Sequence, residues 1–367
     1  MKNIAFWIPN LLGGGAEKVL IDILKLLPKN KYNITLILLY KKGIYIDNIP
    51  KNIKVKYIFG NISNKFICKF IDDIFIKYFS GFIYKYFIKD TYDIEISFLE
   101  GATTKILAAS NNKKSKKIAW IHTDMDKFRW SSRFYKSEQE EEDVYKKYDK
   151  LIFVSKNAQE NFFERFKINV SSEVIYNPII VHEIESKANI NNVKYDELSI
   201  VALGRLVKVK GFDRLIQAHS NIKSKFKHKL IIIGDGPEKE NLISLCYELN
   251  VEDSVEFKGF KKNPYPYIKA GDIYVCSSFT EGYQLAMVEA IILEKPIIST
   301  NIPGPKEILE NGKYGVLCEN SQEGLEKALY NVFGNNLLNN LKIKSIDNKK
   351  RIIEKSSIKK IESILDE

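Results

Sequence analysis

Two glutamates, Glu281 and Glu289, stand eight positions apart in a stretch that follows an apolar run and has the pattern of a helix start. Eight residues advance about 12 Å along a helix and rotate by roughly 80°, so the two carboxylates would reach different parts of one ligand. The helix N-terminus would offer free N–H groups and the positive end of the dipole, which suit a phosphate. Ionised carboxylates only accept hydrogen bonds and therefore suit hydroxyls. The pattern predicts a nucleotide-sugar site, with Glu281 on sugar hydroxyls and Glu289 on a ribose.

Two cations follow another apolar run, 198–203. Arg205 comes directly after Gly204, and Lys210 precedes Gly211 and a probable helix. An arginine can grip a diphosphate with two parallel hydrogen bonds, and a lysine adds a point charge. In a displacement at a sugar carbon, negative charge grows on the departing diphosphate, so fixed cations there favour the transition state. The alternative is a pair of solvated surface cations.

Glycines mark three further turns at the ends of apolar runs. Gly14 and Gly15 lie in Leu11-Leu-Gly-Gly-Gly-Ala-Glu-Lys18, where backbone can approach a ligand, although such a turn is equally often structural. Gly234-Asp-Gly-Pro237 is a tight turn. Gly259 and Phe260 stand where a nucleobase edge could meet backbone groups, and a plain turn is the alternative.

His122 follows the run 117–121 directly, at a strand end where a functional residue is expected. A lone histidine is more often structural. Asp124 and Asp126 just beyond have the Asp-x-Asp form of some metal-dependent sugar transferases, which is a common pattern. Because Arg205 and Lys210 already supply positive charge, we expect no metal and no other cofactor.

Short apolar runs alternate with helical patterns along the whole chain. Continuous apolar runs are typical of parallel strands that are covered on both faces. The rhythm breaks near Tyr176-Asn-Pro178, and a polar stretch, 186–196, has the composition of a linker. We therefore expect an α/β chain of two doubly wound, Rossmann-like domains with a cleft between them, over residues 1–180 and 181–345. A C-terminal helix, 346–367, would pack back on the first domain.

The composition limits the classes of protein. The four cysteines are scattered and have no CxxC pairing, which argues against a disulfide framework and a zinc site. The N-terminus has no small-residue cleavage site, and no run of about 20 apolar residues occurs, so we expect neither a signal peptide nor a membrane span. No nucleic-acid-binding module is recognised.

The charge of +11 is concentrated in the first half. Residues 1–180 hold 30 Lys and Arg against 20 Asp and Glu, whereas the remainder holds 27 against 26. A basic half suggests an anionic partner surface, and a solvated Lys-rich surface is the alternative. The segment 65–89 interleaves Lys65, Lys69 and Lys77 with aromatic residues, which fits a helix in a membrane interface. A helical hairpin with a break at Ser80-Gly81, whose aromatics fill the core, fits equally well.

Several of these motifs, in this order and at these intervals, resemble glycosyltransferase family 4, a family of retaining enzymes with the GT-B fold. The resemblance covers nearly the whole chain. It is carried by the Gly-rich N-terminal loop, Trp120-Ile-His122, Gly204-Arg205 with Lys210-Gly211, Gly234-Asp-Gly-Pro237 and Glu281-x7-Glu289. It implies a donor bound mainly by the second domain, an acceptor bound mainly by the first, and metal-independent transfer with retained configuration.

The resemblance also implies roles. Arg205 and Lys210 would hold the donor diphosphate, and His122 would lie near the reaction centre with Glu281. Many members have Phe after Glu-Gly and then a small residue, whereas this chain has Tyr283 and Gln284, so the donor sugar is open. The expected donor-binding residues are Gly14, Gly15, Gly204, Gly259, Phe260, Gly282, Tyr283, Gln284, Leu285 and Glu289.

The sequence thus predicts a retaining glycosyltransferase of surface-polysaccharide synthesis that uses a nucleotide-sugar, with a UDP-sugar as the favoured donor. The expected acceptor is a glycan or a polyprenyl-diphosphate-linked oligosaccharide. The expected location is cytoplasmic and peripheral, at the anionic inner face of the cell membrane. Two alternatives stay open: a GT-B-like nucleotide-sugar epimerase, and a non-catalytic protein that binds a nucleotide-sugar or glycan.

Overall fold

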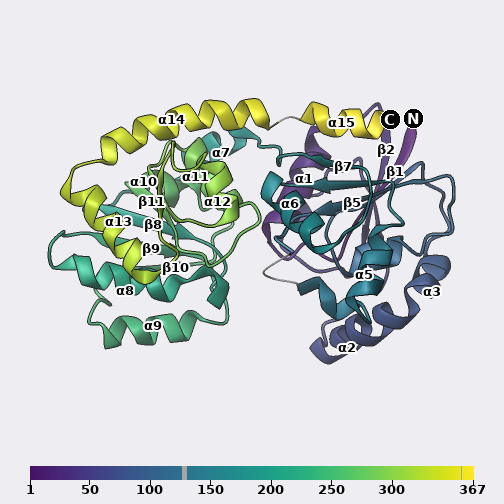
Figure 1. Cartoon of the computed structure of the whole chain (residues 1–367), viewed down its shortest axis with the longest axis horizontal. Coiled ribbons are helices and arrows are strands. Elements are labelled where there is room, and N and C mark those ends of the chain that lie inside the picture. The colour runs from purple at the N-terminus through teal and green to yellow at the C-terminus, as the bar shows by residue number, and fades with distance from the viewer. Residues whose placement is uncertain (126–129, 357) are drawn as a thin grey trace. The chain divides into compact units, whose positions relative to one another are not determined.

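The protein consists of two compact units, each with its own parallel sheet (Figure 1). The computed structural model describes residues 1–125, 130–356 and 358–367, except for the side chain of residue 65. Unit 1 comprises Met1–Ile179 and Ser356–Glu367, and unit 2 comprises Ile180–Lys355. The chain therefore leaves unit 1 once and returns to it at its far end.

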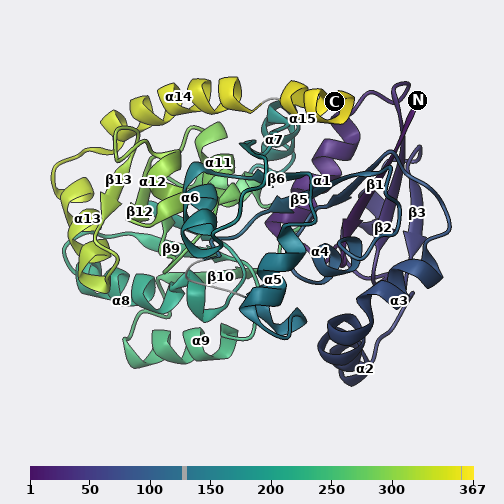
Figure 2. The ribbon, with the colours of Figure 1, turned by 45° about the vertical axis from the view of Figure 1, so that its right-hand side comes forward.

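Unit 1 is built on a seven-stranded parallel sheet in the order β3-β2-β1-β4-β5-β6-β7. Its central strands are largely buried, and β1 and β5 end in buried apolar runs, as a sheet covered on both faces requires. Figure 2 shows β1, β2 and β3 side by side. The strands are β1 (Lys2–Ile8), β2 (Tyr32–Leu38), β3 (Lys54–Tyr57), β4 (Ile94–Ser97), β5 (Lys116–Ile121), β6 (Lys150–Phe153) and β7 (Ser172–Val174).

The strand order of unit 1 reverses between β1 and β4. The chain runs outward from β1 to β3 and then crosses back to β4, so the loops after β1 and β4 diverge and leave a crevice. The helical elements of the unit are α1 (Gly15–Leu26), η1 (Ile46–Asn48), α2 (Lys65–Phe70), η2 (Ile71–Ile76), α3 (Lys77–Phe87), α4 (Ala102–Leu107), η3 (Trp130–Phe134), α5 (Glu138–Tyr145), α6 (Lys156–Arg165) and α15 (Ile358–Asp366).

Unit 2 repeats this plan with six parallel strands in the order β10-β9-β8-β11-β12-β13. Its switch point therefore lies between β8 and β11. The strands are β8 (Ser199–Leu203), β9 (Lys229–Ile233), β10 (Val255–Gly259), β11 (Ile273–Cys276), β12 (Ile297–Thr300) and β13 (Val316–Cys318).

The helices of unit 2 form two groups that pack among themselves. One group holds α8 and α13, with α9 beside α8, and the other holds α7, α10, α11 and α14 (Figure 1). The helical elements are α7 (Val181–Ala188), η4 (Lys208–Lys210), α8 (Phe212–Lys223), α9 (Lys239–Glu248), α10 (Tyr265–Ala270), α11 (Leu285–Ile292), α12 (Pro303–Ile308), α13 (Gln322–Gly334) and α14 (Leu338–Lys355).

The prediction of two doubly wound parallel α/β domains is confirmed. The apolar runs that alternate with helical patterns form β1 to β6 and β8 to β12. The sequence did not predict β7 and β13, because each is an edge strand of only three residues, and β7 also lacks an apolar run.

The far end of the chain differs from the expectation of one crossing helix over 346–367. α14 begins at Leu338 and belongs to unit 2, where Leu341 and Ile352 are buried and the Asn348 amide donates to the carbonyl of Ile308 at 3.2 Å. Only Ser356–Glu367, with α15, belongs to unit 1. A single helical pattern concealed this change of partner at Ser356.

Candidate active site

A basic loop and an acidic loop leave the two strands that flank the switch point of unit 2. The basic loop follows β8 and carries Arg205 and Lys210, and the acidic loop follows β11 and carries Glu281. Because parallel strands end at the same edge, both loops lie at the carboxyl end of the sheet. The structure thus brings the predicted cations and the first predicted acid to one place within a single unit.

Lys210 and Glu281 form an ion pair in which the Lys210 Nζ lies 2.5 Å from a carboxylate oxygen of Glu281. Their side chains are 24 % and 13 % exposed. Burial alone would lower the pKa of the Lys210 ammonium, but the Glu281 carboxylate outweighs that effect and raises the pKa above its ordinary value. The Ser278 hydroxyl donates to the same carboxylate oxygen at 2.7 Å. The Lys210 and Glu281 side chains are therefore held in place before any ligand binds.

Backbone contacts fasten the two loops together. The Phe279 amide donates to the Val209 carbonyl at 2.8 Å, and the Ser277 hydroxyl donates to the Lys210 carbonyl at 2.9 Å. Gly211 has a φ of +61°, and a Cβ there would lie 2.3 Å from the Ser277 carbonyl oxygen. Only glycine allows this close approach of the loops.

Arg214, at the start of α8, lies beneath the acidic loop. Its Nε donates to the Ser277 carbonyl at 2.8 Å, and its guanidinium stacks on the Phe279 ring at 3.8 Å from the centroid. The side chain is only 5 % exposed, and neither terminal nitrogen has a hydrogen-bond partner among the described residues. Nothing in the spacing of the sequence predicts this contact, although arginine is rare in the chain.

Arg205 has a different environment from Lys210. Its side chain is exposed at the loop tip, directly after Gly204, whose amide donates to the Ile233 carbonyl at 3.0 Å. Within the described part of the chain, Arg205 has no ion-pair partner. Its guanidinium is therefore available to an anion from solution.

The helix α11 begins at Leu285, so Glu281 lies in the loop before it, and the expected placement of Glu281 and Glu289 along one helix is wrong. Gln284 caps the helix, is 6 % exposed, and its side-chain oxygen has no hydrogen-bond partner among the described residues. Gly282 and Leu285 are partly exposed on either side, and burial raises the pKa of the half-buried Tyr283 hydroxyl. A buried amide oxygen without a donor is costly, which marks Gln284 as a position where a ligand hydroxyl would be stabilising.

Glu289 lies on the buried side of α11. It is 5 % exposed, and the Tyr265 hydroxyl donates to its carboxylate at 3.0 Å. Tyr265 is a partner that the sequence does not reveal, because it lies on α10, and the strand β11 separates α10 from α11 along the chain. Gly259 at the end of β10 has a φ of +66° and open space where a Cβ would stand, and Phe260 beside it is 52 % exposed.

In unit 1 the predicted residues gather at the carboxyl ends of β1 and β5. Gly14 is the N-cap of α1 and Gly15 its first residue, and both are exposed. His122 directly follows β5 and packs on the Phe98 ring at 4.7 Å. Its Nε2 is buried without a hydrogen-bond partner among the described residues, and burial lowers the pKa of the imidazole to about 3. His122 is therefore neutral at physiological pH.

A buried carboxylate that the sequence analysis missed lies beside His122. Glu100 follows β4 at the switch point and is fully buried. It accepts from the His122 amide at 3.0 Å, the Thr123 hydroxyl at 2.5 Å and the Trp130 indole at 3.1 Å. The signal in the sequence was an acid followed by Gly101 at the end of an apolar run.

Only the first acid of the Asp-x-Asp pattern lies within the described residues. Asp124 is 4 % exposed and accepts from the Asn161 amide at 3.0 Å, whereas Asp126 lies outside the described residues. In residues 1–125, 130–356 and 358–367, no group of three or more His, Cys, Asp or Glu side chains is arranged to hold a metal ion.

The remaining predicted residues lie elsewhere on unit 1. Lys65 begins α2, Lys69 is exposed on that helix, and Lys77 begins α3. They belong to a separate surface and do not join the strand-end residues. Across the described helices, none is both long enough and apolar enough to cross a bilayer.

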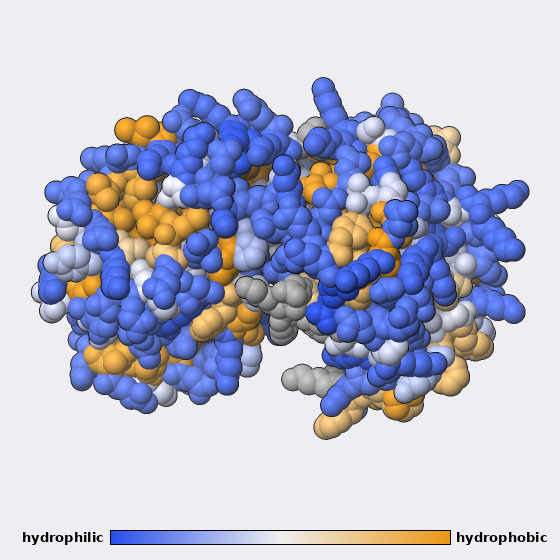
Figure 3. Space-filling model, viewed as in Figure 1, coloured by the Kyte–Doolittle hydropathy of each residue, from blue (hydrophilic) through white to orange (hydrophobic). Residues whose placement is uncertain are grey.

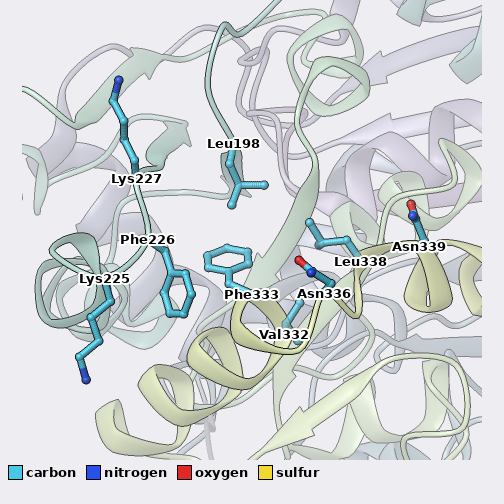
Figure 4. A pocket seen from close by; sticks show the side chains of 9 residues that line it. All are labelled: Leu198, Lys225, Phe226, Lys227, Val332, Phe333, Asn336, Leu338 and Asn339. Atoms are coloured by element: carbon cyan, nitrogen blue, oxygen red, sulfur yellow. The ribbon is translucent and has the colours of Figure 1, made fainter.

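A hollow of about 710 Å³ lies at the opposite, amino end of the unit 2 strands. It is lined by carbon-rich side chains and two amides, and Figure 4 shows the ammonium groups of Lys225 and Lys227 directed away from the Phe333 ring. Its lining includes no acidic side chain, and its two lysines point away from it. The hollow therefore lacks the groups that bind a nucleotide-sugar.

Comparison with protein families supports this view of unit 2. Residues 183–350 match the model described as glycosyl transferases group 1. Among curated proteins, an uncharacterized glycosyltransferase of Haemophilus influenzae is 28% identical over 345 residues, or 90% of each chain. N-acetylgalactosamine-N,N'-diacetylbacillosaminyl-diphospho-undecaprenol 4-alpha-N-acetylgalactosaminyltransferase of Campylobacter jejuni is 30% identical over 182 residues, about half of either chain. The O-antigen biosynthesis glycosyltransferase WclY of Escherichia coli is 30% identical over 161 residues, 42% of this chain and 44% of WclY.

Solved structures extend the likeness to the whole chain. Anabaena HepE, in complex with UDP and glucose, has a TM-score of 0.75 at 17% identity and covers 100% of this chain and 98% of its own. S. aureus TarM, in complex with Fondaparinux, alpha-GlcNAc-glycerol and UDP, has a TM-score of 0.77 at 17% identity and covers 99% and 98%. These likenesses confirm the predicted GT-B fold. Together the matches identify an enzyme of the glycosyltransferase class with the GT-B fold, in which residues 183–350 are similar to glycosyl transferases group 1.

Proposed function

We propose that the chain transfers a sugar from a UDP-sugar to a hydroxyl of a lipid-linked glycan during surface-polysaccharide synthesis, with retained configuration and without a metal. The observation that carries the proposal is the Lys210–Glu281 pair beside the exposed Arg205 at the switch point of unit 2. Fixed positive charge and a hydroxyl-accepting carboxylate within one loop pair are what a sugar diphosphate needs.

The cations act on the leaving group. As the bond between the anomeric carbon and the diphosphate oxygen breaks, charge grows on the diphosphate, and Arg205 and Lys210 stabilise it more in the transition state than in the ground state. The new bond joins the anomeric carbon to the acceptor oxygen, whose proton passes to the departing diphosphate. No covalent enzyme nucleophile is required.

The acids and the amide hold the donor. Glu281 accepts from sugar hydroxyls, the unpartnered oxygen of Gln284 accepts another, and Glu289 takes the ribose. The backbone amides of Gly282, Tyr283 and Leu285 at the start of α11 bind the diphosphate. Gly204, Gly259 and Phe260 border the nucleotide.

His122 serves near the reaction centre as a neutral group. Burial keeps its pKa at about 3, so the imidazole donates or accepts a hydrogen bond without adding charge beside the anomeric carbon. Glu100, which binds the His122 amide, fixes the strand end that carries it. We therefore assign Glu100 a positioning role.

The choice of donor and acceptor rests on relatives. HepE and TarM are solved with UDP, and the printed name of the Campylobacter jejuni relative describes a diphospho-undecaprenol acceptor. A lipid-linked acceptor implies work at the inner face of the cell membrane, in the cytoplasm.

The test is a thermal-shift screen of UDP-, GDP- and ADP-sugars, followed by kinetics with the donor that binds. A ligand that binds only the folded state raises the unfolding temperature, and UDP-sugars should do so most strongly. Arg205→Ala should then lower kcat by roughly 100-fold or more, whereas the matched control Lys208→Ala, an exposed lysine of the same loop, should not.

Three outcomes would contradict the proposal. Unchanged turnover in Arg205→Ala would remove the leaving-group role. Loss of activity with a chelator, restored by manganese, would implicate Asp124 and Asp126. An epimerised nucleotide-sugar formed without any acceptor would favour the epimerase.

A further inference from the structure

Unit 1 carries an exposed aromatic face on the segment formed by α2, η2 and α3. Large apolar side chains there are open to solvent, with exposed fractions from 43% for Ile74 to 84% for Phe66. Figure 3 shows hydrophobic colouring gathered over this segment next to hydrophilic neighbours. The aromatic face consists of Phe66, Ile67, Phe70, Ile74, Tyr78, Phe79, Phe82 and Tyr86.

Helix geometry keeps this face on one side. Six of its members recur every four residues from Phe66 to Tyr86. In an α-helix that ladder would drift by about 40° per step. The segment Ile71–Ile76 is a π-helix, whose wider turn makes four residues less than one revolution and so winds the ladder back. The irregular backbone at Phe79 adds a further local adjustment.

The opposite side of the segment is anchored in the core. Ile76, Ile83 and Tyr84 are buried, and the Phe75 ring packs on Phe59 at 6.4 Å. The Tyr84 hydroxyl donates to the buried Glu95 at 2.6 Å. The segment therefore packs its inner side on the core, and only some of its aromatics fill the core as the hairpin alternative expects.

The charges around the aromatic face are sorted by sign. The segment 65–89 contains five lysines and two acids. Both acids, Asp72 and Asp73, are paired with Arg133, at 3.0 Å and 3.1 Å. Lys69, Lys85 and Lys89 are exposed. The outward surface is therefore aromatic and basic.

We infer that the aromatic face docks unit 1 on an anionic lipid bilayer, with the rings of the face in the interface and the flanking lysines on lipid phosphates. Aromatic rings favour the interfacial region, and each nearby lysine adds attraction to anionic headgroups. A second copy of the chain is a poorer occupant, because a symmetric pairing would bring like-charged lysines together. The inference deepens the membrane location in the proposed function and rests on it in that respect, but vesicle binding needs no substrate, so failure to dock and failure of sugar transfer are distinguishable.

A reporter tryptophan tests where the face goes. Phe82→Trp places an indole on the aromatic face, and Tyr247→Trp places one at a 63% exposed position of unit 2. On mixing with vesicles of phosphatidylglycerol and phosphatidylcholine, the emission of Phe82→Trp should shift to shorter wavelength, while that of Tyr247→Trp should not. Pure phosphatidylcholine or high salt should weaken the shift. Equal shifts for both variants, or none for Phe82→Trp, would overturn the inference.

Flotation of the full chain with the same vesicles measures affinity. The double variant Phe70→Ser/Phe82→Ser should bind at least roughly tenfold more weakly, because two aromatic rings that would move from water into the bilayer are removed. Lys69→Glu/Lys85→Glu should lose the salt-sensitive part of the vesicle affinity. Lys227→Glu, which changes a side chain that is 84% exposed on unit 2, should bind vesicles like the wild type.

Folding and self-association controls decide the remaining outcomes. The variants replace exposed side chains, so their unfolding temperatures should match the wild type. Concentration-dependent dimers of the wild type that the Phe70→Ser/Phe82→Ser variant abolishes, together with wild-type chains that do not float, would show that the face joins two copies and would refute bilayer docking.

Discussion

Lys210 and Glu281 already satisfy each other in the protein without ligand. Their pairing orients the ammonium and the carboxylate. An incoming diphosphate must compete with the attraction between these two groups. Because both side chains are partly exposed, that attraction is moderated by solvent. A ligand that offers phosphate to the lysine and hydroxyls to the acid recovers both partners at once, so the pair favours a sugar diphosphate over an inorganic anion.

Two buried histidines predict how stability depends on pH. His219 is fully buried, with its nitrogens 2.8 Å from His228 and 2.9 Å from the Ser254 hydroxyl. Burial lowers the pKa of His219 from 6.5 to about 3 and also lowers that of His228. The unfolded state therefore binds protons first, so the stability contributed by the neutral pair is complete above pH 6.5 and is lost as the pH falls toward 3.

The measurement is the unfolding temperature between pH 7 and pH 4. The unfolding temperature should fall throughout that range. The free energy of unfolding should decrease by up to roughly 1.4 kcal/mol per pH unit for each titrating histidine. His219→Gln should flatten the slope, and His182→Gln, at an exposed position, should leave it unchanged. An unaltered slope in His219→Gln would disprove the assignment.

The sequence could predict the charged residues of the site but not their partners. Arg205, Lys210 and Glu281 follow apolar runs, and the carboxyl ends of parallel strands meet at one edge. Ser278, Tyr265 and Glu100 acquire their roles through contacts between loops of different strands. Ser278 and Tyr265 are common types whose spacing carries no signal, and the position of Glu100 before Gly101 at a strand end does not reveal its partners, so the folded chain is needed to show these contacts.

At the scale of elements, the acidic loop is held as a rigid extension of β11. Arg214 supports it from α8 through the Ser277 carbonyl and the Phe279 ring. The buried, unpartnered terminal nitrogens show that this position is retained despite a desolvation cost. The arrangement implies that Arg214 positions Glu281 without touching substrate.

Arg214→Met tests that positioning. The variant keeps the apolar bulk but removes the donor to Ser277, so the loop should loosen and the KM for donor should rise by roughly tenfold, with kcat changed much less. Arg214→Lys should not restore the KM, because an ammonium cannot both donate in the guanidinium plane and stack. Lys223→Met on the same helix is the matched control. An equal KM for Arg214→Met and the wild type would exclude the role.

The segment 65–89 shows what an element prediction from sequence can and cannot achieve. The sequence left open a helix in a membrane interface and a helical hairpin broken at Ser80-Gly81, and the structure has α2, η2 and α3 in succession with an irregular backbone at Phe79. Periodicity could not decide between membrane and core, because apolar residues occur on both sides of the helix. The π-helical stretch, which separates the buried side from the exposed side, has no sequence signature at this length.

At the scale of the whole molecule, the two sheets were predictable and the division of the chain at its end was not. Apolar runs encode strands independently of their neighbours, so alternation alone predicts two doubly wound units. The change of unit at Ser356 depends on which core buries Ile352 and which buries Ile361, and both residues are part of similar helical patterns.

Removing residues 356–367 should destabilise unit 1 and spare unit 2. The segment buries Ile361, Ile364 and Leu365, each contributing about 1.5–3 kcal/mol. The ammonium of Lys2 also donates to the Leu365 carbonyl at 3.0 Å. Calorimetry and limited proteolysis should show earlier unfolding and cleavage of residues 1–179 alone.

The control is Glu367→Gln. Hydrogen bonds from Lys116 and Lys150 lower the pKa of the Glu367 carboxyl to about 2, but the side chain is 48% exposed. An exposed pair contributes about 0–1 kcal/mol, so this variant should unfold almost like the wild type. A truncated chain whose unit 1 keeps its full stability would show that α15 is dispensable.

The return of the chain to unit 1 has a consequence for biosynthesis. A ribosome makes every strand of the first sheet, and then all of unit 2, before the helix that seals β1 and β2 emerges. During that interval the nascent first sheet has an uncovered apolar strip, while the later unit can mature without waiting. Translational pausing after codon 355 should therefore prolong chaperone dependence of the early half of the chain.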